Sequence, residues 1–183
     1  MAAAPRRWVA DLLHVWFHRL GPGDWFRPPA AVDQMLERRF AATLAAMRHR
    51  PAEGFLRDPQ LALAAILLFD QVPRNIYRGT PAAFATDQLA RALSHGAIAR
   101  GWIGPASRQA RQFMLMPLMH SEHIADQRLS LAMFAHYAPG NLSFARSHYR
   151  MVARFGRFPH RNDVLGRKST SAERKAVAAG NSW

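Results

Sequence analysis

The amino-acid sequence predicts an all-α protein of about eight amphipathic helices, and three observations support this prediction. Large apolar residues recur at steps of three and four positions, as at Val32, Leu36, Phe40 and Leu44, which places them on one helix face. The sequence has no alternating run of β-branched residues with a hairpin turn, the pattern typical of strands. Proline and glycine separate the helical stretches at short intervals, so we expect neighbouring helices to form antiparallel pairs.

The amino-terminal half contains several helix signals. An apolar face that includes Trp16 predicts a first helix near the amino terminus, and the spacing above predicts another helix over 31–48. Asp58 and Thr80 each precede a proline, which combines a capping side chain with a residue that needs no hydrogen bond in the first helical turn. We therefore expect helices to begin at both positions.

The carboxyl-terminal half ends in two predicted helices. Asn141 is placed to cap a helix over 144–155, and the buried face of that helix is expected to contain Phe144. Thr170 and Glu173 have the spacing of a capping box. This pattern predicts a last helix over about 170–179, followed by a frayed C terminus.

Length and composition indicate a single domain over residues 1–183. Of the 183 residues, 49% are hydrophobic and 20% are charged, which suffices for a packed core. The chain has no cysteine, which excludes disulfides, a thiolate zinc site and a cysteine nucleophile. The longest apolar run, residues 61–69, is far shorter than the ~20 residues of a membrane-spanning helix. We expect a cytoplasmic protein without a secretory signal or a membrane partner.

The formal net charge of +13 raises the question of an acidic macromolecular partner. Only two of the 25 basic residues are lysine, and the arginines are spread along the chain without a run longer than two. Binding to nucleic acid depends on several cations that neutralise neighbouring phosphates. The scattered arrangement therefore disfavours nucleic acid as a partner, although the chain is more basic from residue 99 onward.

Two prolines lie inside helical patterns. Pro73 and Pro117 each remove one backbone donor and clash with the carbonyl group four residues earlier. The carbonyl oxygens of Phe69 and Phe113 are thereby expected to lose their usual helical partners. We expect the helix to bend or end at both prolines, and polar residues cluster close to each of them.

The first polar cluster contains Asp70, Arg74, Asn75 and Arg78. Asp70 follows nine apolar residues, so we expect it to be at least partly buried and paired, because an unpaired buried carboxylate is very costly. Arg74, four residues on, is the nearest candidate partner. The cluster is then either a buried ion pair that joins two helices, or a site where Arg74 and Arg78 bind a carboxylate or phosphate.

The second polar cluster is rich in histidine and carboxylate groups. On a helix, His120, His123 and Gln127 would share one side. Glu122 and Asp126 would lie four residues apart on the neighbouring side. Such residues suit a structural hydrogen-bond network, acid–base chemistry or a metal site. Because the HExxH order is missing and one helix supplies few ligands, no metal ligands are assigned.

The third polar cluster occupies a predicted turn. Gly156 interrupts the helical pattern, and Arg157, His160 and Arg161 follow within a few residues. The arginines are expected either to neutralise the carboxylates of the other two clusters or to form an anion pocket. In the second case His160 would act as a proton donor.

Three strings of the sequence resemble a known family. They are residues 70–81 (DQVPRNIYRGTP), 120–127 (HSEHIADQ) and 154–162 (RFGRFPHRN). In these strings the chain resembles a bacterial family catalogued as domain of unknown function 924, and further matches cover nearly the whole chain. The resemblance implies an all-helical, tetratricopeptide-like fold and no established activity. The chain departs from the family at His123, where an acidic or amide residue is usual. This departure favours His120, Glu122 and Asp126 over His123 as site residues.

The function predicted from these clusters is the binding, with or without turnover, of a small anionic metabolite in a pocket between helices. The candidate catalytic residues are His120, Glu122 and His160. The candidate ligand-binding residues are Asp70, Arg74, Asn75, Arg78, Asp126, Arg157 and Arg161. The sequence identifies no cofactor, and it leaves open whether the protein is an enzyme.

Two other functions remain open from the sequence. A tetratricopeptide-like module would offer a concave helical surface to a protein partner without catalysis. Nucleic-acid binding through the basic surface would show an affinity that falls steeply with added salt.

Overall fold

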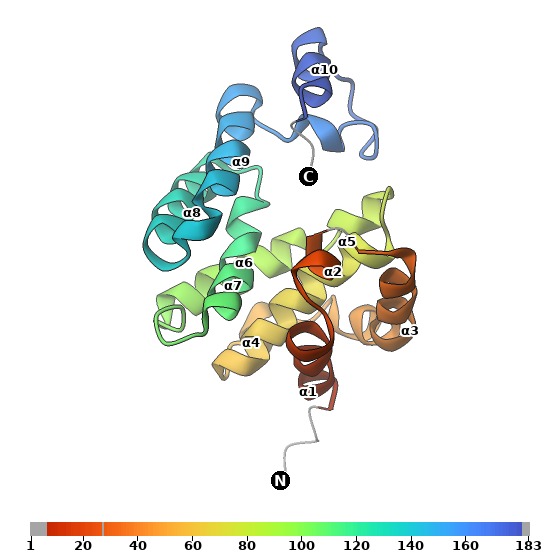
Figure 1. The fold of residues 1–183 in the computed structure, drawn as a ribbon, viewed down its shortest axis with the longest axis vertical. Helices are drawn as coiled ribbons and strands as arrows, with labels where there is room; N and C mark the ends of the chain where they lie inside the picture. The colour runs from red at the N-terminus through yellow and green to blue at the C-terminus, as the bar shows by residue number, and fades with distance from the viewer. Residues whose placement is uncertain (1–6, 27, 181–183) are drawn as a thin grey trace. The chain divides into compact units, whose positions relative to one another are not determined.

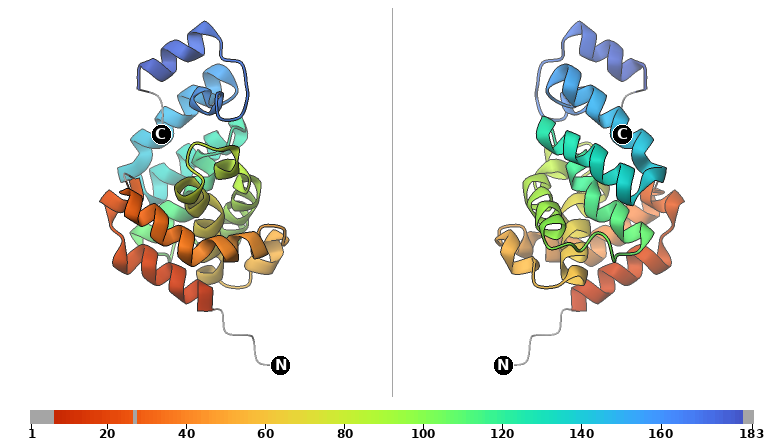
Figure 2. Two further views of the ribbon diagram at one scale, coloured as in Figure 1. Left: turned by 90° about the vertical axis from the view of Figure 1, so that its right-hand side faces the viewer. Right: turned by 90° about the vertical axis from the view of Figure 1, so that its left-hand side faces the viewer.

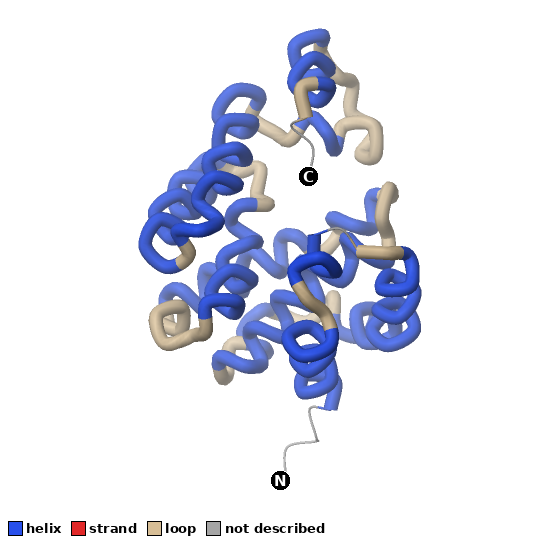
Figure 3. Tube along the Cα trace, viewed as in Figure 1, coloured by secondary structure: helices blue, strands red, loops and turns tan. Residues whose placement is uncertain are grey.

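The structure is a computed structural model that describes residues 7–26 and 28–180. Within these residues the chain forms helices and loops and no strand, which confirms the predicted all-α class (Figure 3). Eight of the α-helices there have eight or more residues, as expected from the sequence. None of the described helices is both long and apolar enough to cross a membrane.

The chain divides into two compact units, and the first consists of residues 1–78 and 82–100. Its α-helices, labelled in Figure 1, are α1 (Arg7–His14), α2 (Pro22–Phe26), α3 (Ala30–Met47), α4 (Pro59–Ile66), α5 (Val72–Ile76) and α6 (Asp87–Ala99). A π-helical turn over Val15–Arg19 continues α1, and a second one over Leu67–Gln71 joins α4 to α5. A 3-10 turn over Ala52–Phe55 precedes α4.

The core of the first unit forms around α4 and the π-helical turn that follows it. Every residue from Leu61 to Phe69 is buried, so this segment is covered on all sides. Helices α1 and α6 pack against α4, and α3 contributes the fully buried side chains of Leu36 and Phe40. Asp58 accepts a hydrogen bond from the amide of Leu61 at 2.8 Å, which confirms the predicted start of α4.

The second unit consists of residues 79–81 and 101–183. Its α-helices are α7 (Arg108–Met119), α8 (Ile124–Tyr137), α9 (Leu142–Phe155) and α10 (Ser171–Ala178). Helix α8 packs beside both α7 and α9, and Figure 2 shows these three helices from two sides. Phe113, Phe134 and Phe158 are fully buried in this unit.

The last helix of the second unit begins as the sequence predicts. The amide of Thr170 donates to Glu173 Oε2 at 2.7 Å, and the amide of Glu173 donates to Thr170 Oγ1 at 3.2 Å. These two bonds form the expected capping box. Gly156 ends α9 with a φ of 70°, a left-handed conformation that glycine adopts without steric cost. The C terminus that was expected to fray, residues 181–183, lies outside the described residues.

Three local predictions need correction. The predicted helix start at Thr80 precedes only a 3-10 turn over Pro81–Phe84. Asn141 occupies the N-cap position of α9, but its side chain forms no capping hydrogen bond. Phe144 is 53% exposed, because Ala145 and not Phe144 lies on the buried face in the first turn of α9.

Candidate functional site

Pro73 interrupts the helical hydrogen bonding of the first unit, as the sequence predicts. The carbonyl oxygen of Phe69, four residues earlier, accepts a hydrogen bond from Thr86 Oγ1 at 2.6 Å. Thr86 is buried and directly precedes α6. The hydroxyl group of a distant residue therefore takes the place of the missing proline amide and ties the proline bend to α6.

Arg74 lies between two carboxylates of the first unit. Its Nη1 is 3.2 Å from Asp70 Oδ1 and 2.9 Å from Asp87 Oδ1, and its Nη2 donates to Asp87 Oδ2 at 3.0 Å. Asp70 is 1% exposed, so the predicted buried pair is confirmed. Burial alone would lower the pKa of Arg74, but the charges of Asp70 and Asp87 outweigh it and raise that pKa.

The other two members of the first cluster bind Asp33, in the first turn of α3. Asn75 Nδ2 donates to Asp33 Oδ1 at 2.8 Å. Arg78 Nη2 donates to both carboxylate oxygens of Asp33, at 3.2 and 3.1 Å. Arg74 and Arg78 thus each have a carboxylate partner within their own unit. This arrangement corresponds to the first of the two alternatives for the cluster, ion pairing between helices.

The segment 120–123 is a turn between α7 and α8, not part of a helix as expected. Gln127, fully buried in the first turns of α8, donates from Nε2 to the carbonyl oxygens of Met119 and Ser121, each at 2.7 Å. This side chain satisfies carbonyl groups for which the end of α7 leaves no helical donor. His123 is exposed and Gln127 is buried, so the predicted shared helix side does not exist.

Glu122 joins this turn to the third polar cluster. Arg167 donates to both of its carboxylate oxygens, at 2.8 and 2.9 Å, and the amide of Phe158 donates to Oε1 at 2.7 Å. Burial would raise the pKa of Glu122, but the hydrogen bonds from Arg167 and Phe158 and the charges of Arg167 and Arg161 lower it. Glu122 is therefore held as a carboxylate that fixes the position of the Phe158 backbone.

Two more candidate residues also have partners within the second unit. Asp126, 3% exposed, accepts a hydrogen bond from Ser121 Oγ at 2.7 Å. Arg157 donates to both carboxylate oxygens of Glu173, at 2.7 and 3.0 Å. The hydrogen bond from Arg157 and the backbone hydrogen bond from Thr170 lower the pKa of Glu173 to about 2. These contacts fasten the beginning of α10 to the turn that follows α9.

Two histidines and one arginine lie around the buried ring of Phe158, and a third histidine lies beside one of them. We call His120, His148, His160 and Arg161 the imidazole cluster. The rings of His148 and His160 have their centres 5.5 and 5.7 Å from the centre of the Phe158 ring. The guanidinium carbon of Arg161 lies 4.6 Å from the same ring centre. His120 lies 6.1 Å from His148, and its carbonyl oxygen accepts from Arg161 Nη2 at 3.1 Å.

The surroundings of His148 favour the neutral form of its ring. His148 is 5% exposed, and its pKa is lowered to about 3, mainly by burial. The charges of His120, Arg161 and His160 also act to lower this pKa, whereas the hydrogen bond to the Phe144 carbonyl oxygen acts to raise it. Because that oxygen lies 2.8 Å from Nδ1 and can only accept, Nδ1 carries the proton of the neutral ring. His148 is therefore neutral at pH 7.

The second and third polar clusters come together within the second unit, whereas the first cluster belongs to the first unit. In the described part of the chain, no group of three histidine or acidic residues could hold a metal ion. The sequence patterns did not indicate that His148 or Arg167 belongs to a site. His148 was assigned only to the apolar face of its helix, although a histidine at a buried helix position was a signal for a polar contact.

The family of the chain follows from comparison with known proteins. A family model described as a bacterial protein of unknown function, DUF924, matches residues 12–181. The chain belongs to this family. It is also similar to the solved structure of a protein of unknown function from Agrobacterium tumefaciens, with 38% identity over 94% of this chain and 97% of that chain and a TM-score of 0.88. No curated protein matches the chain.

Membership of the DUF924 family confirms the resemblance that the three strings carry. The matched range contains all three polar clusters of this DUF924 protein, including the imidazole cluster. The structural similarity extends over almost the full length of both chains, so the two proteins share their fold. The descriptions of the family and of the solved structure assign no activity.

Proposed function

We propose that this DUF924 protein binds a small anionic metabolite at its imidazole cluster. The observation that carries the proposal is the position of Arg161, a buried guanidinium stacked on Phe158, whose ring also contacts the imidazole rings of His148 and His160. Arginine presents several N–H donors in a planar fork that matches carboxylate and phosphate groups. The electrostatic energy of a buried cation of this kind falls when an anion approaches it.

The nearby carboxylate Glu122 binds other donors as well. Glu122 is close enough to Arg161 for the two charges to interact, and its oxygens also accept hydrogen bonds from Arg167 and from the Phe158 amide. Arg167 thus supplies a second cation beside this carboxylate. After burial, the charges of His120, Arg161 and His160 lower the pKa of His148, and this supports several groups at the cluster that attract an anion.

The four residues of the imidazole cluster differ in solvent exposure, which defines an outer and an inner pair. His120 and His160 are half-buried, whereas Arg161 and His148 are buried. An anion that approaches from solvent would meet the two outer imidazole rings first and the guanidinium beneath them. If the protein also has a catalytic step, His120 or His160 would serve as the acid or base, because a histidine with a pKa of about 3 is a weak base at neutral pH. Glu122 would act by holding Phe158 in place.

The architecture and the cellular location belong to the same proposal. Helices α7, α8 and α9 are consecutive neighbours joined by short connections, which supports a tetratricopeptide-like arrangement of antiparallel pairs in this unit. A metabolite-binding role is compatible with the cytoplasmic location expected from the sequence.

The proposal is tested by nuclear magnetic resonance of the imidazole Cε1–H groups while inorganic phosphate or succinate is added. We expect saturable shifts of the His120 and His160 resonances and little change at His123. The variant His160→Asn should weaken the response roughly tenfold, since it removes one of the two outer imidazole rings. The control His123→Asn changes an exposed histidine in the turn between α7 and α8 and should leave the response unchanged.

Two results would overturn the proposal. One is the absence of saturable shifts at His120 and His160 with both probes. The other is an equal response in the wild-type protein and in His160→Asn, which would place binding elsewhere on the basic surface.

A further inference from the structure

Helix α9 presents a row of arginines that have no acidic partner. Arg146, Arg150 and Arg154 follow at intervals of four residues, so they lie on one side of the helix, and all three are exposed. The helix itself contains no aspartate or glutamate. In the described residues no carboxylate forms an ion pair with any of the three. Their charge is therefore available to a ligand.

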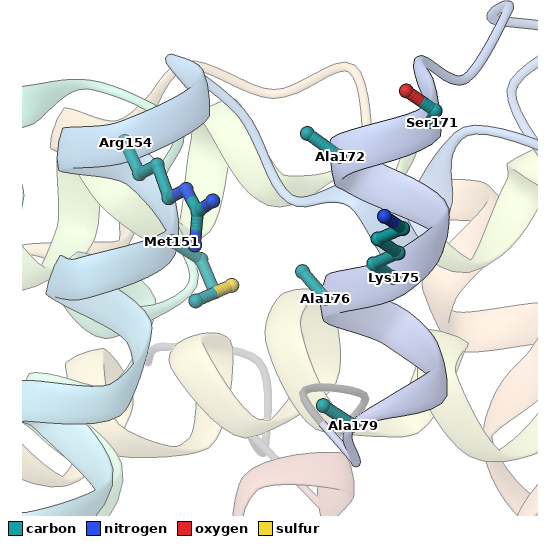
Figure 4. Close-up of a pocket in the computed structure, with 7 residues that line it drawn as sticks. All are labelled: Met151, Arg154, Ser171, Ala172, Lys175, Ala176 and Ala179. Carbon is teal, nitrogen blue, oxygen red and sulfur yellow. The ribbon is translucent and has the colours of Figure 1, made fainter.

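The carboxyl-terminal end of this row borders a groove between α9 and α10. The groove has a volume of about 410 Å³, with Met151 and Arg154 on the side of α9 (Figure 4). The α10 side is lined by Ser171, Ala172, Lys175, Ala176 and Ala179. Alanine side chains are too short to reach across to α9, so the space between the helices stays open. The groove thus has an apolar floor and two cations, Arg154 and Lys175, at its rim.

Contacts outside the groove hold its two helices in place. The ion pair between Arg157 and Glu173 fixes the first turn of α10 to the segment after α9. Ala176 and Met151 also belong to one apolar cluster with Val152 and the buried Phe158. Helix α10 is therefore held at its first turn and on its buried face. The groove between α9 and α10 is thus a defined part of the fold.

We infer that this groove binds a small amphiphilic anion, a molecule with one carboxylate or phosphate group and an apolar body. Ligand sites are commonly apolar hollows of roughly 300–1,000 Å³ with a few polar groups that fix orientation, which matches this groove. The lining of α10 is roughly 12 Å long at its helical rise, enough for a short acyl or aromatic body. Arg154 and Lys175 would bind the anionic head, and Met151 with the alanines would cover the body.

A small molecule fits this groove better than a protein segment does. Stable protein interfaces engage about 20–30 residues on each side, whereas seven residues line the groove. The site shares no residue with the imidazole cluster, so the inference stands apart from the proposed function. The binding test at the groove and the binding test at the imidazole cluster can therefore succeed or fail independently.

Octanoate is the probe for this inference, and 1-octanol is its neutral counterpart. Binding is followed by isothermal titration calorimetry and by the methyl resonance of Met151 in protein labelled at methionine. We expect octanoate to bind with 1:1 stoichiometry and shift the Met151 resonance, and octanol to bind at least about tenfold more weakly. The variants Arg154→Gln and Lys175→Gln should each weaken octanoate binding by roughly three- to tenfold.

A pair of size variants tests the apolar floor. Ala172→Leu places a larger side chain at the groove and should abolish octanoate binding, while leucine preserves helix propensity. Ala178→Leu is the matched control, because Ala178 is exposed on the same helix and does not line the groove. Arg146→Gln is the charge control at the far end of the arginine row and should leave binding unchanged. Circular dichroism shows whether each variant retains its helices.

Three results would overturn the inference. Octanol that binds as tightly as octanoate would show that the rim cations play no part. Octanoate binding that survives Ala172→Leu in a folded protein would place the site elsewhere. Binding of an acidic amphipathic peptide to the groove, with no binding of octanoate, would assign the surface to a protein partner instead.

Discussion

The hydroxyl group of Thr86 donates a hydrogen bond to the carbonyl oxygen of Phe69, 2.6 Å away, inside the core of the first unit. Phe69 lies four residues before Pro73, whose ring nitrogen has no proton to donate. A single side chain therefore satisfies one of the two carbonyl groups that the sequence predicts to lose their helical donors.

Replacing Thr86 with valine should reduce the free energy of unfolding by about 1–3 kcal/mol, because the Phe69 carbonyl group then stays buried without a donor. Urea unfolding followed by circular dichroism measures this loss. In a Pro73→Ala background the same replacement should cost less, since residue 73 regains an amide. Thr43→Val is the control. Thr43 is partly exposed on α3, so its replacement should change the free energy of unfolding little. An equal loss in both backgrounds would contradict the proposed link between Thr86 and Pro73.

The second prediction concerns Arg74 and its two carboxylates. Arg74→Met removes the guanidinium beside the buried Asp70 carboxylate, so we expect a loss of roughly 3–5 kcal/mol in the free energy of unfolding. Asp87→Asn should cost clearly less, because the side chain of Asp87 is 24% exposed and Arg74 keeps Asp70. Chemical unfolding compares the two variants. The double variant Asp70→Asn/Arg74→Met should recover part of the loss, and a further loss would contradict this account.

The third prediction concerns acidification and His148. Its pKa is about 3 in the folded protein and 6.5 in an unfolded chain, so between these values the unfolded state binds more protons. The contribution of neutral His148 to stability is full above pH 6.5 and declines as the pH falls from 6.5 towards 3. The slope should approach about 1.4 kcal/mol per pH unit within this window.

Unfolding by urea at a series of pH values measures this slope. His148→Leu removes the titrating ring and should flatten the profile between pH 6.5 and 4.5. His136→Leu, which removes an exposed histidine from the last turn of α8, should keep the wild-type slope. Identical slopes for His148→Leu and the wild type would show that another group causes the pH dependence.

The fourth prediction concerns Glu173, whose pKa of about 2 lies below the ordinary value of 4.5. A carboxyl group with a lowered pKa stabilises the fold above pH 4.5, and this stabilisation is lost as the pH falls from 4.5 towards 2. Glu173→Gln should remove the loss in this range and lower the melting temperature at pH 7. Arg157→Ala should also lower that temperature by several degrees, because it leaves Glu173 buried without its cation. A melting temperature that Arg157→Ala leaves unchanged would indicate that the pair is not structural.

Local features of the fold were predictable from the sequence because their partners lie within one helical turn. The capping bonds at Asp58 and Thr170 join residues three apart, and the Asp70–Arg74 pair joins residues four apart. Gly156 was predictable as a helix end because its conformation is a property of one residue. These features need no knowledge of the tertiary structure.

The candidate site was less predictable because its contacts join distant parts of the chain. Arg167 and Glu122 are 45 residues apart, and nothing in their local sequence indicates that they pair. The helical interpretation of His120 and His123 failed because Gln127 satisfies the last carbonyl groups of α7 and allows a turn there. His148 has helical core spacing, and that spacing alone does not reveal the aromatic and cationic groups around it.

The bonds of Glu122 have a consequence for how the molecule is made. This carboxylate accepts hydrogen bonds from the Phe158 backbone and the Arg167 side chain, so it joins the turn at residue 122 to residues that are synthesised much later. A nascent chain stalled before residue 167 would already contain all three histidines of the imidazole cluster, yet lack the guanidinium that holds Glu122. Complete fixation of this carboxylate therefore requires synthesis of the segment that contains Arg167.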